Sequence, residues 1–132
     1  MKSKLWGLLP FLLLFMATGA QAEFFQQPLL SPLELHRLQE QHPEGITVVD
    51  IRPLEHKVPE ASYTAGHIPE SVSSPYATWR GQPENPGKMV TVDKLTWLVQ
   101  ALGVEQDTPV VVVHRGDSPS DFGAAARVYW SL

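Results

Sequence analysis

The architecture of this chain follows from one segment, Pro109-Val110-Val111-Val112-Val113-His114-Arg115-Gly116-Asp117-Ser118-Pro119-Ser120-Asp121-Phe122-Gly123-Ala124-Ala125-Ala126-Arg127-Val128-Tyr129-Trp130. Its four consecutive valines predict a short strand that is buried on both faces. The residues after them are rich in Gly, Ser, Asp and Pro, which favour a loop, and from Gly123 onward the composition favours a helix. A strand, loop and helix of this kind build sites at the carboxyl end of a parallel sheet, where helix N–H groups face an anion or a reacting atom.

Two further helices are predicted before the valines. Ser31 can cap a helix that has Pro32 at its first position, and Glu34 completes a capping box. A second helix lies between Thr91, as its N-cap, and Gly103, as its C-terminal stop, and its apolar side chains fall on one face.

Strands and loops fill the remaining segments. Residues 46–51 predict a mostly apolar strand, and residues 66–69 a short extended piece. Residues 52–63 predict a loop with one helical turn, and residues 74–88 a surface loop around Trp79. Strands that alternate with helices favour an α/β fold, in which helices cover both faces of a parallel sheet.

The predicted sheet is thin, and the sequence ends at Leu132 inside a predicted helix. A chain of this length buries only a modest fraction of its surface. We therefore expect residues 23–132 to be one domain that is C-terminally incomplete and marginally stable, the front of a longer protein. The alternative is a small complete domain that its last helix closes.

The first 22 residues predict a secretory signal peptide. Residues 1–4 are basic, residues 5–15 are largely apolar, and Ala20-Gln21-Ala22 has the small-x-small pattern of a cleavage site. An uncleaved membrane anchor is the alternative, but the apolar run is shorter than the about 20 residues that span a bilayer. We expect cleavage before Glu23, a periplasmic or secreted mature chain, and no membrane attachment afterwards.

Charge and cysteine content exclude several functions. Cleavage removes Lys2 and Lys4, which leaves eight basic against fourteen acidic side chains, a formal charge of −6. An acidic chain of this kind disfavours nucleic acid as a partner. The chain has no cysteine, so it has no disulfide, no thiolate metal site and no cysteine nucleophile. We expect no cofactor.

Four pieces of the sequence, in order, resemble a known family. They are Val48-Val49-Asp50-Ile51-Arg52, Tyr63-Thr64-Ala65-Gly66-His67-Ile68-Pro69, Leu102-Gly103-Val104 before the valines, and Ala125-Ala126-Arg127-Val128-Tyr129-Trp130. Together they are similar to the rhodanese-like (thiosulfate sulfurtransferase) domain, and most of all to the non-catalytic first domain of two-domain sulfurtransferases. The resemblance covers nearly all of the mature chain. It implies a domain truncated before its last strand and helix.

The resemblance implies that active members carry sulfur as a persulfide on a cysteine directly after the central strand. A helix N-terminus lowers the pKa of such a thiol and stabilises its anion. In this chain His114 occupies that position, and the loop of residues 115–123 is longer than the six-residue loop of active members. The residues equivalent to the active-site loop are His114, Arg115, Gly116, Asp117, Ser118 and Gly123. The aspartates in this loop would repel an anionic sulfur donor.

Asp50, Arg52, Gly66 and His67 form the second part of the resemblance. Asp50 and Arg52 could clamp a sulfur anion, but a structural ion pair at the strand end is the simpler interpretation. Gly66 indicates close backbone packing, and His67 is then a hydrogen-bonded structural histidine rather than a base.

The other histidines show no metal-ligand spacing, so we expect no metal site. His114 could act as a general base or a metal ligand, since imidazole titrates near neutral pH, and the simpler alternative is a polar cap on the loop. Core or inter-domain packing is expected for four aromatic residues, Trp79, Trp97, Tyr129 and Trp130.

These observations predict a Cys-less, non-catalytic domain that supports a catalytic domain in the same full-length sulfurtransferase, which uses thiosulfate or 3-mercaptopyruvate. Its partner would be that missing C-terminal rhodanese domain, and a small sulfur anion is a possible ligand. The alternative is a regulatory module that binds an anion or a protein through the His114 loop. A phosphatase with a similar loop is excluded, because it needs a cysteine.

Overall fold

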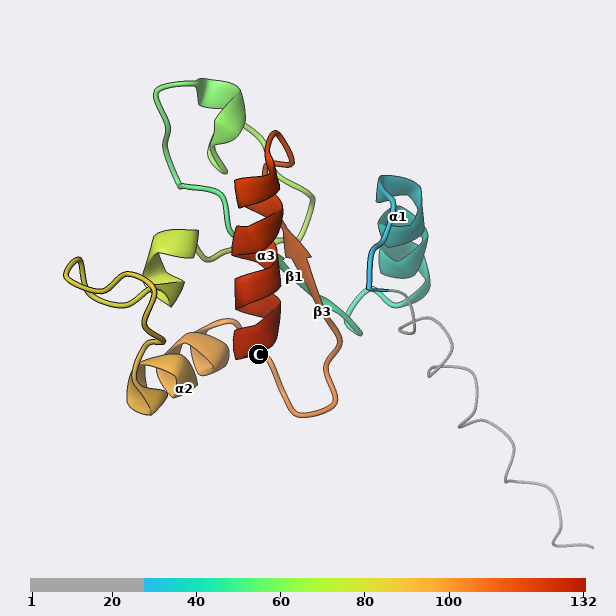
Figure 1. Cartoon of the computed structure of the whole chain (residues 1–132). Coiled ribbons are helices and arrows are strands. Elements are labelled where there is room, and N and C mark those ends of the chain that lie inside the picture. Colours follow the sequence, from blue (N-terminus) through green and yellow to red (C-terminus); the bar gives the residue numbers. More distant parts are fainter. Residues whose placement is uncertain (1–27) are drawn as a thin grey trace, which may run out of the picture. The chain divides into compact units, whose positions relative to one another are not determined.

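The computed structural model describes residues 28–132 of the chain (Figure 1). Within them, Ser31–Leu132 forms one unit by its internal contacts. The predicted signal peptide, residues 1–22, lies outside the described residues. In the part of the chain that the structure describes, no helix is both long enough and apolar enough to cross a membrane.

Three parallel strands form the sheet. The middle strand β1 (Thr47–Asp50) pairs with β2 (Val72–Ser73) on one side and with β3 (Val110–Val113) on the other. The register joins Asp50 to Ser73 and to Val113, so all three strands end at one edge. The predicted parallel sheet of an α/β fold is confirmed.

The short strand before Trp79 comes later in the chain than predicted. Residues 66–69 are not a strand; the chain turns there, with the Ser71 amide donating to the Ile68 carbonyl at 3.0 Å and Glu70 at φ +65°. Pro69 has no amide hydrogen to give to a ladder. Val72 is therefore the first residue of this segment that pairs with β1.

The main hydrophobic core lies on one face of the sheet. Its buried members are Val49, Ile51, Trp79, Leu98, Leu102 and Val128. They come from β1 and the residue after it, from the 3₁₀-helix η3 (Tyr76–Trp79), from α2 (Val92–Ala101) with its C-cap, and from α3 (Pro119–Ser131).

Trp79 is fully buried, and its indole N–H donates to Ser74 Oγ at 3.0 Å. It is a core residue, as expected for a tryptophan by default. The prediction of a surface loop is therefore wrong at this residue, because η3 turns the indole inward from a segment whose later residues, 82–89, are exposed.

The opposite face is covered by α1 (Pro32–Gln41). Strand side chains alternate between faces, so Val48 points away from the core that holds Val49, yet it is 2% exposed. The α1 residues Leu35 and Leu38 are buried and belong to no part of the main core. Figure 1 shows α1 on the far side of β1 and β3 from α2. Helices therefore lie on both faces of the sheet.

The helix ends follow the predicted signals closely. Ser31 Oγ accepts from the Glu34 amide, and the Glu34 carboxylate accepts from the Ser31 amide at 2.7 Å, which completes the capping box. The Thr91 side chain caps α2, and Gly103 after it has φ +68°, a backbone conformation that glycine adopts without strain.

Two predictions for the valine segment are wrong. The valines of β3 are half-buried rather than buried, because β3 has a strand on only one side in the described residues. The helix α3 begins at Pro119 rather than at Gly123. Ser118 caps it and Pro119 occupies its first turn, where a missing amide hydrogen costs nothing. The loop is therefore residues 114–118, and Gly123 lies in the helix.

Candidate functional site

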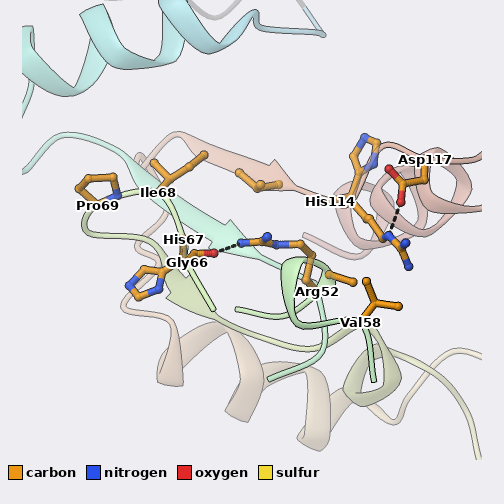
Figure 2. Close-up of a pocket in the computed structure, with 11 residues that line it drawn as sticks. Arg52, Val58, Gly66, His67, Ile68, Pro69, His114 and Asp117 are labelled. Atoms are coloured by element: carbon orange, nitrogen blue, oxygen red, sulfur yellow. Dashed lines mark hydrogen bonds and ion pairs between the residues drawn. The ribbon is translucent and has the colours of Figure 1, made fainter. Parts of the chain in front are cut away.

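The chain segments after β1 and β3 meet at the carboxyl edge of the sheet. The Ile51 amide donates to the Val113 carbonyl at 2.9 Å, which places Arg52 and His114 on neighbouring strands at the same level. These two residues line one cavity of about 710 Å³ (Figure 2). The structure thus brings together the two parts of the sequence that carry the family resemblance.

At the β1 side, Asp50 and Arg52 form the structural ion pair that the sequence indicates. The Arg52 Nη2 lies 2.6 Å from Asp50 Oδ2, and the Arg52 amide donates to Asp50 Oδ1 at 3.0 Å. Asp50 is fully buried, and Arg52 retains 15% side-chain exposure. Hydrogen bonding to Asp50 raises the pKa of Arg52 above its ordinary value, against the opposing effect of burial.

Arg52 also holds the segment that carries Gly66 and His67. Its Nη2 donates to the Gly66 carbonyl at 2.9 Å, as Figure 2 shows. A Cβ at Gly66 would meet nothing within 4 Å, so the expectation of close backbone packing at Gly66 is wrong. The carbonyl of Gly66, rather than its missing side chain, is what the site uses.

His67 is tied to Tyr63 and not to His114. Its ring stacks on Tyr63 with centroids 3.9 Å apart and an interplanar angle of 11°, and its Nδ1 lies 3.1 Å from the Tyr63 carbonyl oxygen. Tyr63 is itself anchored, because its hydroxyl donates to the Ser71 carbonyl at 2.6 Å. Figure 2 shows the imidazoles of His67 and His114 at opposite ends of the site. His67 is therefore hydrogen-bonded within its own segment, as the sequence analysis expects.

His114 follows β3 directly, at the start of the loop that leads to α3. Its Nδ1 is buried and has no hydrogen-bond partner in the described residues. Phe122, one turn into α3, meets its ring edge-on with the centroids 6.3 Å apart. Sequence reasoning missed Phe122; its placement depends on the helix starting at Pro119.

Several polar groups of the loop from Arg115 to Ser118 bond within the loop or to the first turn of α3. Arg115 and Asp117 form an ion pair with half-exposed side chains. The Asp121 carboxylate accepts hydrogen bonds from the amides of Asp117 and Ser118, at 3.1 and 3.0 Å, and from the Ser118 hydroxyl at 3.0 Å. Gly116 has φ +82°, which allows the tight turn.

Asp121 therefore acts as an internal anion at the N-terminus of α3. Amides at a helix start attract negative charge, and this carboxylate accepts from two amides of the loop that follows His114. From the sequence, Asp121 was expected only to repel an anion, together with Asp117, and not to accept hydrogen bonds from the loop. The Ser118-Pro119-Ser120-Asp121 pattern is a capping-box signal that could have found it.

The cavity between the two loops has a mixed lining with little free charge. Its lining residues are Arg52, Val58, Ala61, Gly66, His67, Ile68, Pro69, Val113, His114, Arg115 and Asp117. Both of its arginines are paired with carboxylates, Arg52 with Asp50 and Arg115 with Asp117. Among residues 28–132, no three His, Asp or Glu side chains converge as metal ligands.

A family model for the rhodanese-like domain matches residues 31–130. The chain belongs to the rhodanese-like domain family. The match covers all the helices and strands described above except the last residue of α3, and the fold agrees with the family that the four sequence pieces resemble. A search of curated proteins and a search of solved structures each returned no match. This rhodanese-like domain contains no cysteine, so it has no side chain that can carry a persulfide.

Proposed function

We propose that this chain is a non-catalytic rhodanese-like domain of an exported thiosulfate or 3-mercaptopyruvate sulfurtransferase, and that it supports a catalytic domain outside these residues. The observation that carries the proposal is His114, an imidazole in the position of the nucleophile in a chain without cysteine. The sulfur of the donor would pass to a cysteine of the catalytic domain and from there to a thiophilic acceptor. Export rests on the predicted signal peptide of residues 1–22.

The hydrogen bonds of the loop favour a domain that supports another domain over a domain that is itself catalytic. An active loop needs free amides around the sulfur anion, because they lower the pKa of the thiol and stabilise the negative charge. Here the amides of Asp117 and Ser118 already donate to Asp121. The scaffold pair of Asp50 and Arg52, by contrast, is complete.

The test is thiocyanate formation from thiosulfate and cyanide. We expect the chain to show only the rate of a sample without protein, and turnover above that rate would overturn the proposal. The full polypeptide purified from its native cells is the second sample. We expect it to begin at Glu23, to contain a cysteine-bearing rhodanese domain, and to form thiocyanate.

Two variants separate the missing nucleophile from the closed loop. His114→Cys supplies a thiol but leaves Asp121 in place, so we expect its thiocyanate rate to stay near background. His114→Cys combined with Asp121→Ala frees the loop amides and is expected to react faster than the single variant. A single variant as fast as the double one would show that Asp121 does not block the loop.

The cavity beside His114 favours a second candidate, a regulatory module that binds a partner. Because Arg52 and Arg115 are both paired and Asp121 holds the loop amides, the lining suits a protein segment better than a free anion. Thiosulfate at millimolar concentration is then expected to leave the amide NMR signals of residues 114–118 unchanged. Saturable shifts of those signals would favour the anion instead.

A further inference from the structure

Met89 contains the only sulfur atom among the described residues. The chain has three methionines and no cysteine, and the other two methionines, Met1 and Met16, precede residue 28. Met89 is 46% exposed, so solvent and small solutes reach its side chain. Peroxides oxidise a thioether to a sulfoxide. Oxidation of sulfur within residues 28–132 can therefore occur at Met89 alone.

Met89 follows a segment that is held by its own turns. The Asn85 amide donates to the Gln82 carbonyl at 2.9 Å, and the Lys88 amide donates to the Asn85 carbonyl at 3.0 Å. Gly81 packs closely against this turn, because a Cβ at Gly81 would collide with the Asn85 carbonyl oxygen. The backbone before Met89 is thus well defined, although its side chains are exposed.

The guanidinium of Arg127, on α3, lies beside the Met89 sulfur. Its Nη2 is 4.0 Å from Met89 Sδ and donates to the carbonyls of Gly87 and Lys88 at 2.8 and 2.9 Å. The Ser131 hydroxyl is also 3.8 Å from the sulfur, but its shorter contact is the 2.8 Å hydrogen bond to the Arg127 carbonyl. A thioether is a weak acceptor, so the sulfur contributes little to these contacts.

One donor of the Arg127 guanidinium has no acceptor. Its Nε is buried and has no hydrogen-bond partner in the described residues. Nε and Nη2 of a guanidinium donate along the same edge, as Arg52 shows, since both of these atoms donate to Asp50 Oδ2 at 3.0 and 2.6 Å. A buried donor without an acceptor costs free energy. The Nε–Nη2 edge of Arg127 could therefore accommodate one more oxygen.

We propose that Met89 is an oxidation site for hydrogen peroxide or an organic peroxide, and that Arg127 binds the oxygen of the sulfoxide formed there. A sulfur lone pair attacks the O–H oxygen of the peroxide, an S–O bond forms and the O–O bond breaks. The sulfur loses two electrons, which the peroxide gains. The proton of the attacked O–H group passes to the leaving oxygen, which departs as water or an alcohol.

The geometry allows the sulfoxide oxygen to reach the guanidinium. The oxygen is bonded directly to a sulfur that lies 4.0 Å from Arg127 Nη2, and an N–H···O hydrogen bond needs about 2.9 Å between its heavy atoms. The flexible methionine side chain can turn the oxygen toward the Nε–Nη2 edge. Sulfoxides commonly disrupt packing because they are polar. Here the sulfoxide supplies an acceptor to a charged donor, so oxidation tightens the hold of α3 on residues 87–89.

This inference does not rest on the proposed sulfur-transfer role, because His114 and its loop take no part in it. Treatment of the 132-residue chain with hydrogen peroxide is the test. The Met89 peptide should gain the mass of one oxygen atom. The melting temperature should rise by about 4 °C, since a hydrogen bond from a charged donor outweighs the ordering of the side chain.

Two variants identify the groups responsible for this rise. Met89→Leu removes the sulfur and nearly keeps the volume, so peroxide should leave its melting temperature unchanged; it controls for oxidation at Met1, Met16 and the tryptophans. Arg127→Lys keeps a positive charge but loses the Nε–Nη2 edge. Oxidation should then fail to raise the melting temperature.

The Arg127 Nε–H also gives a readout that needs no variant. Its NMR proton signal should move downfield when Met89 is oxidised, because the N–H gains an acceptor. The full polypeptide from native cells is the second sample. After peroxide treatment, peptide mass mapping should find Met89 oxidised in it as well.

Several results would overturn the proposal. A melting temperature that falls or stays constant would mean that the sulfoxide gains no stabilising partner. An equal rise in Arg127→Lys, or an Arg127 Nε–H signal that does not move, would exclude the guanidinium as that partner. Met89 that stays reduced in the full polypeptide, under conditions that oxidise it in the 132-residue chain, would exclude it as an oxidation site of the intact protein.

Discussion

The segments after β1 and β3 lie at the same edge of the sheet, but their ion pairs differ in burial and in the distance along the sequence that they connect. After β1, Asp50 is fully buried and Arg52 nearly so, and Arg52 reaches across fourteen residues of sequence to the Gly66 carbonyl. After β3, the ion pair of Arg115 and Asp117 is 39% and 58% exposed and joins residues two apart.

This difference distinguishes a side of the site that holds the fold together from a side that forms only local contacts. The β1 side ties distant segments together, and its buried carboxylate would be costly to leave without a partner. The contacts on the β3 side are local, since the Asp121 carboxylate accepts hydrogen bonds from the amides of Asp117 and Ser118. The β1 side of this edge thus joins distant segments, whereas the loop after β3 is held by the helix that follows it.

The largest expected effect comes from breaking the buried pair. Arg52→Ala leaves the Asp50 carboxylate buried and unpaired, which costs about 3–5 kcal/mol of unfolding free energy. Arg115→Ala breaks the exposed pair and should cost about 1 kcal/mol or less. Urea denaturation followed by circular dichroism measures both changes on the same chain.

Arg52→Lys sharpens this comparison, because it keeps the positive charge but loses the two-pronged hydrogen bonding of the guanidinium. Its loss of stability should fall between those of the two alanine variants. Equal losses for Arg52→Ala and Arg115→Ala would show that burial does not distinguish the two sides of the site.

An intermediate effect on stability is expected when the Asp121 carboxylate, the internal anion, is removed. Asp121→Ala removes the acceptor from the start of α3 and should cost about 1 kcal/mol, as the loss of a helix cap does. The freed amides of Asp117 and Ser118 can then bind an added anion. Sodium sulfate should therefore raise the melting temperature of Asp121→Ala more than that of the unchanged chain.

Asp117→Ala is the matched control for the sulfate experiment. It removes an aspartate from the same loop but leaves Asp121 on the amides. Sulfate stabilises folded proteins in general, so only the difference between the two variants is informative. Equal gains in melting temperature would contradict the role of Asp121 as an internal anion.

The sequence predicts the fold where local chemistry decides the structure. The N-caps of α1 and α2 could be predicted from the local sequence, because Ser31 and Thr91 each accept a hydrogen bond from the backbone amide three residues ahead. The alternation of strands and helices predicts the parallel sheet. The position of β2 was missed, since two residues are too few to show a period and only their pairing with Val49 and Asp50 defines the strand.

The sequence names several of the residues that line the cavity, but it does not predict their contacts. His114 and Arg52 carry the family resemblance, so their meeting at one edge follows from the parallel sheet. The role of Asp121 was missed because α3 was predicted to begin at Gly123. The capping box that starts the helix begins at Ser118 instead. The burial of the β3 valines was overestimated, since periodicity cannot show whether a strand has one neighbour or two.

The smallest effect is expected at the capping box of α1, which has the same design as that of α3 but lies outside the site. The Ser31 hydroxyl donates to Glu34 at 2.6 Å, and this hydrogen bond lowers the pKa of Glu34 below its ordinary value. A lowered pKa in the folded state means that the cap stabilises α1 above the unfolded-state pKa and is lost as pH falls through the folded one.

The pH dependence of this cap is local, since Glu34 is only half-buried and bonds within its own helix turn. An NMR titration of the Glu34 carboxyl should show a midpoint below that of an ordinary glutamate, and Ser31→Ala should return the midpoint toward the ordinary value. The amide of Leu35 should exchange faster with solvent in acid in the unchanged chain, as the first turn of α1 frays. The same midpoint in both chains would mean that the box on α1 is not formed in solution. In that case a capping box would fix the start of a helix only where loop amides also donate to its carboxylate, as they do to Asp121.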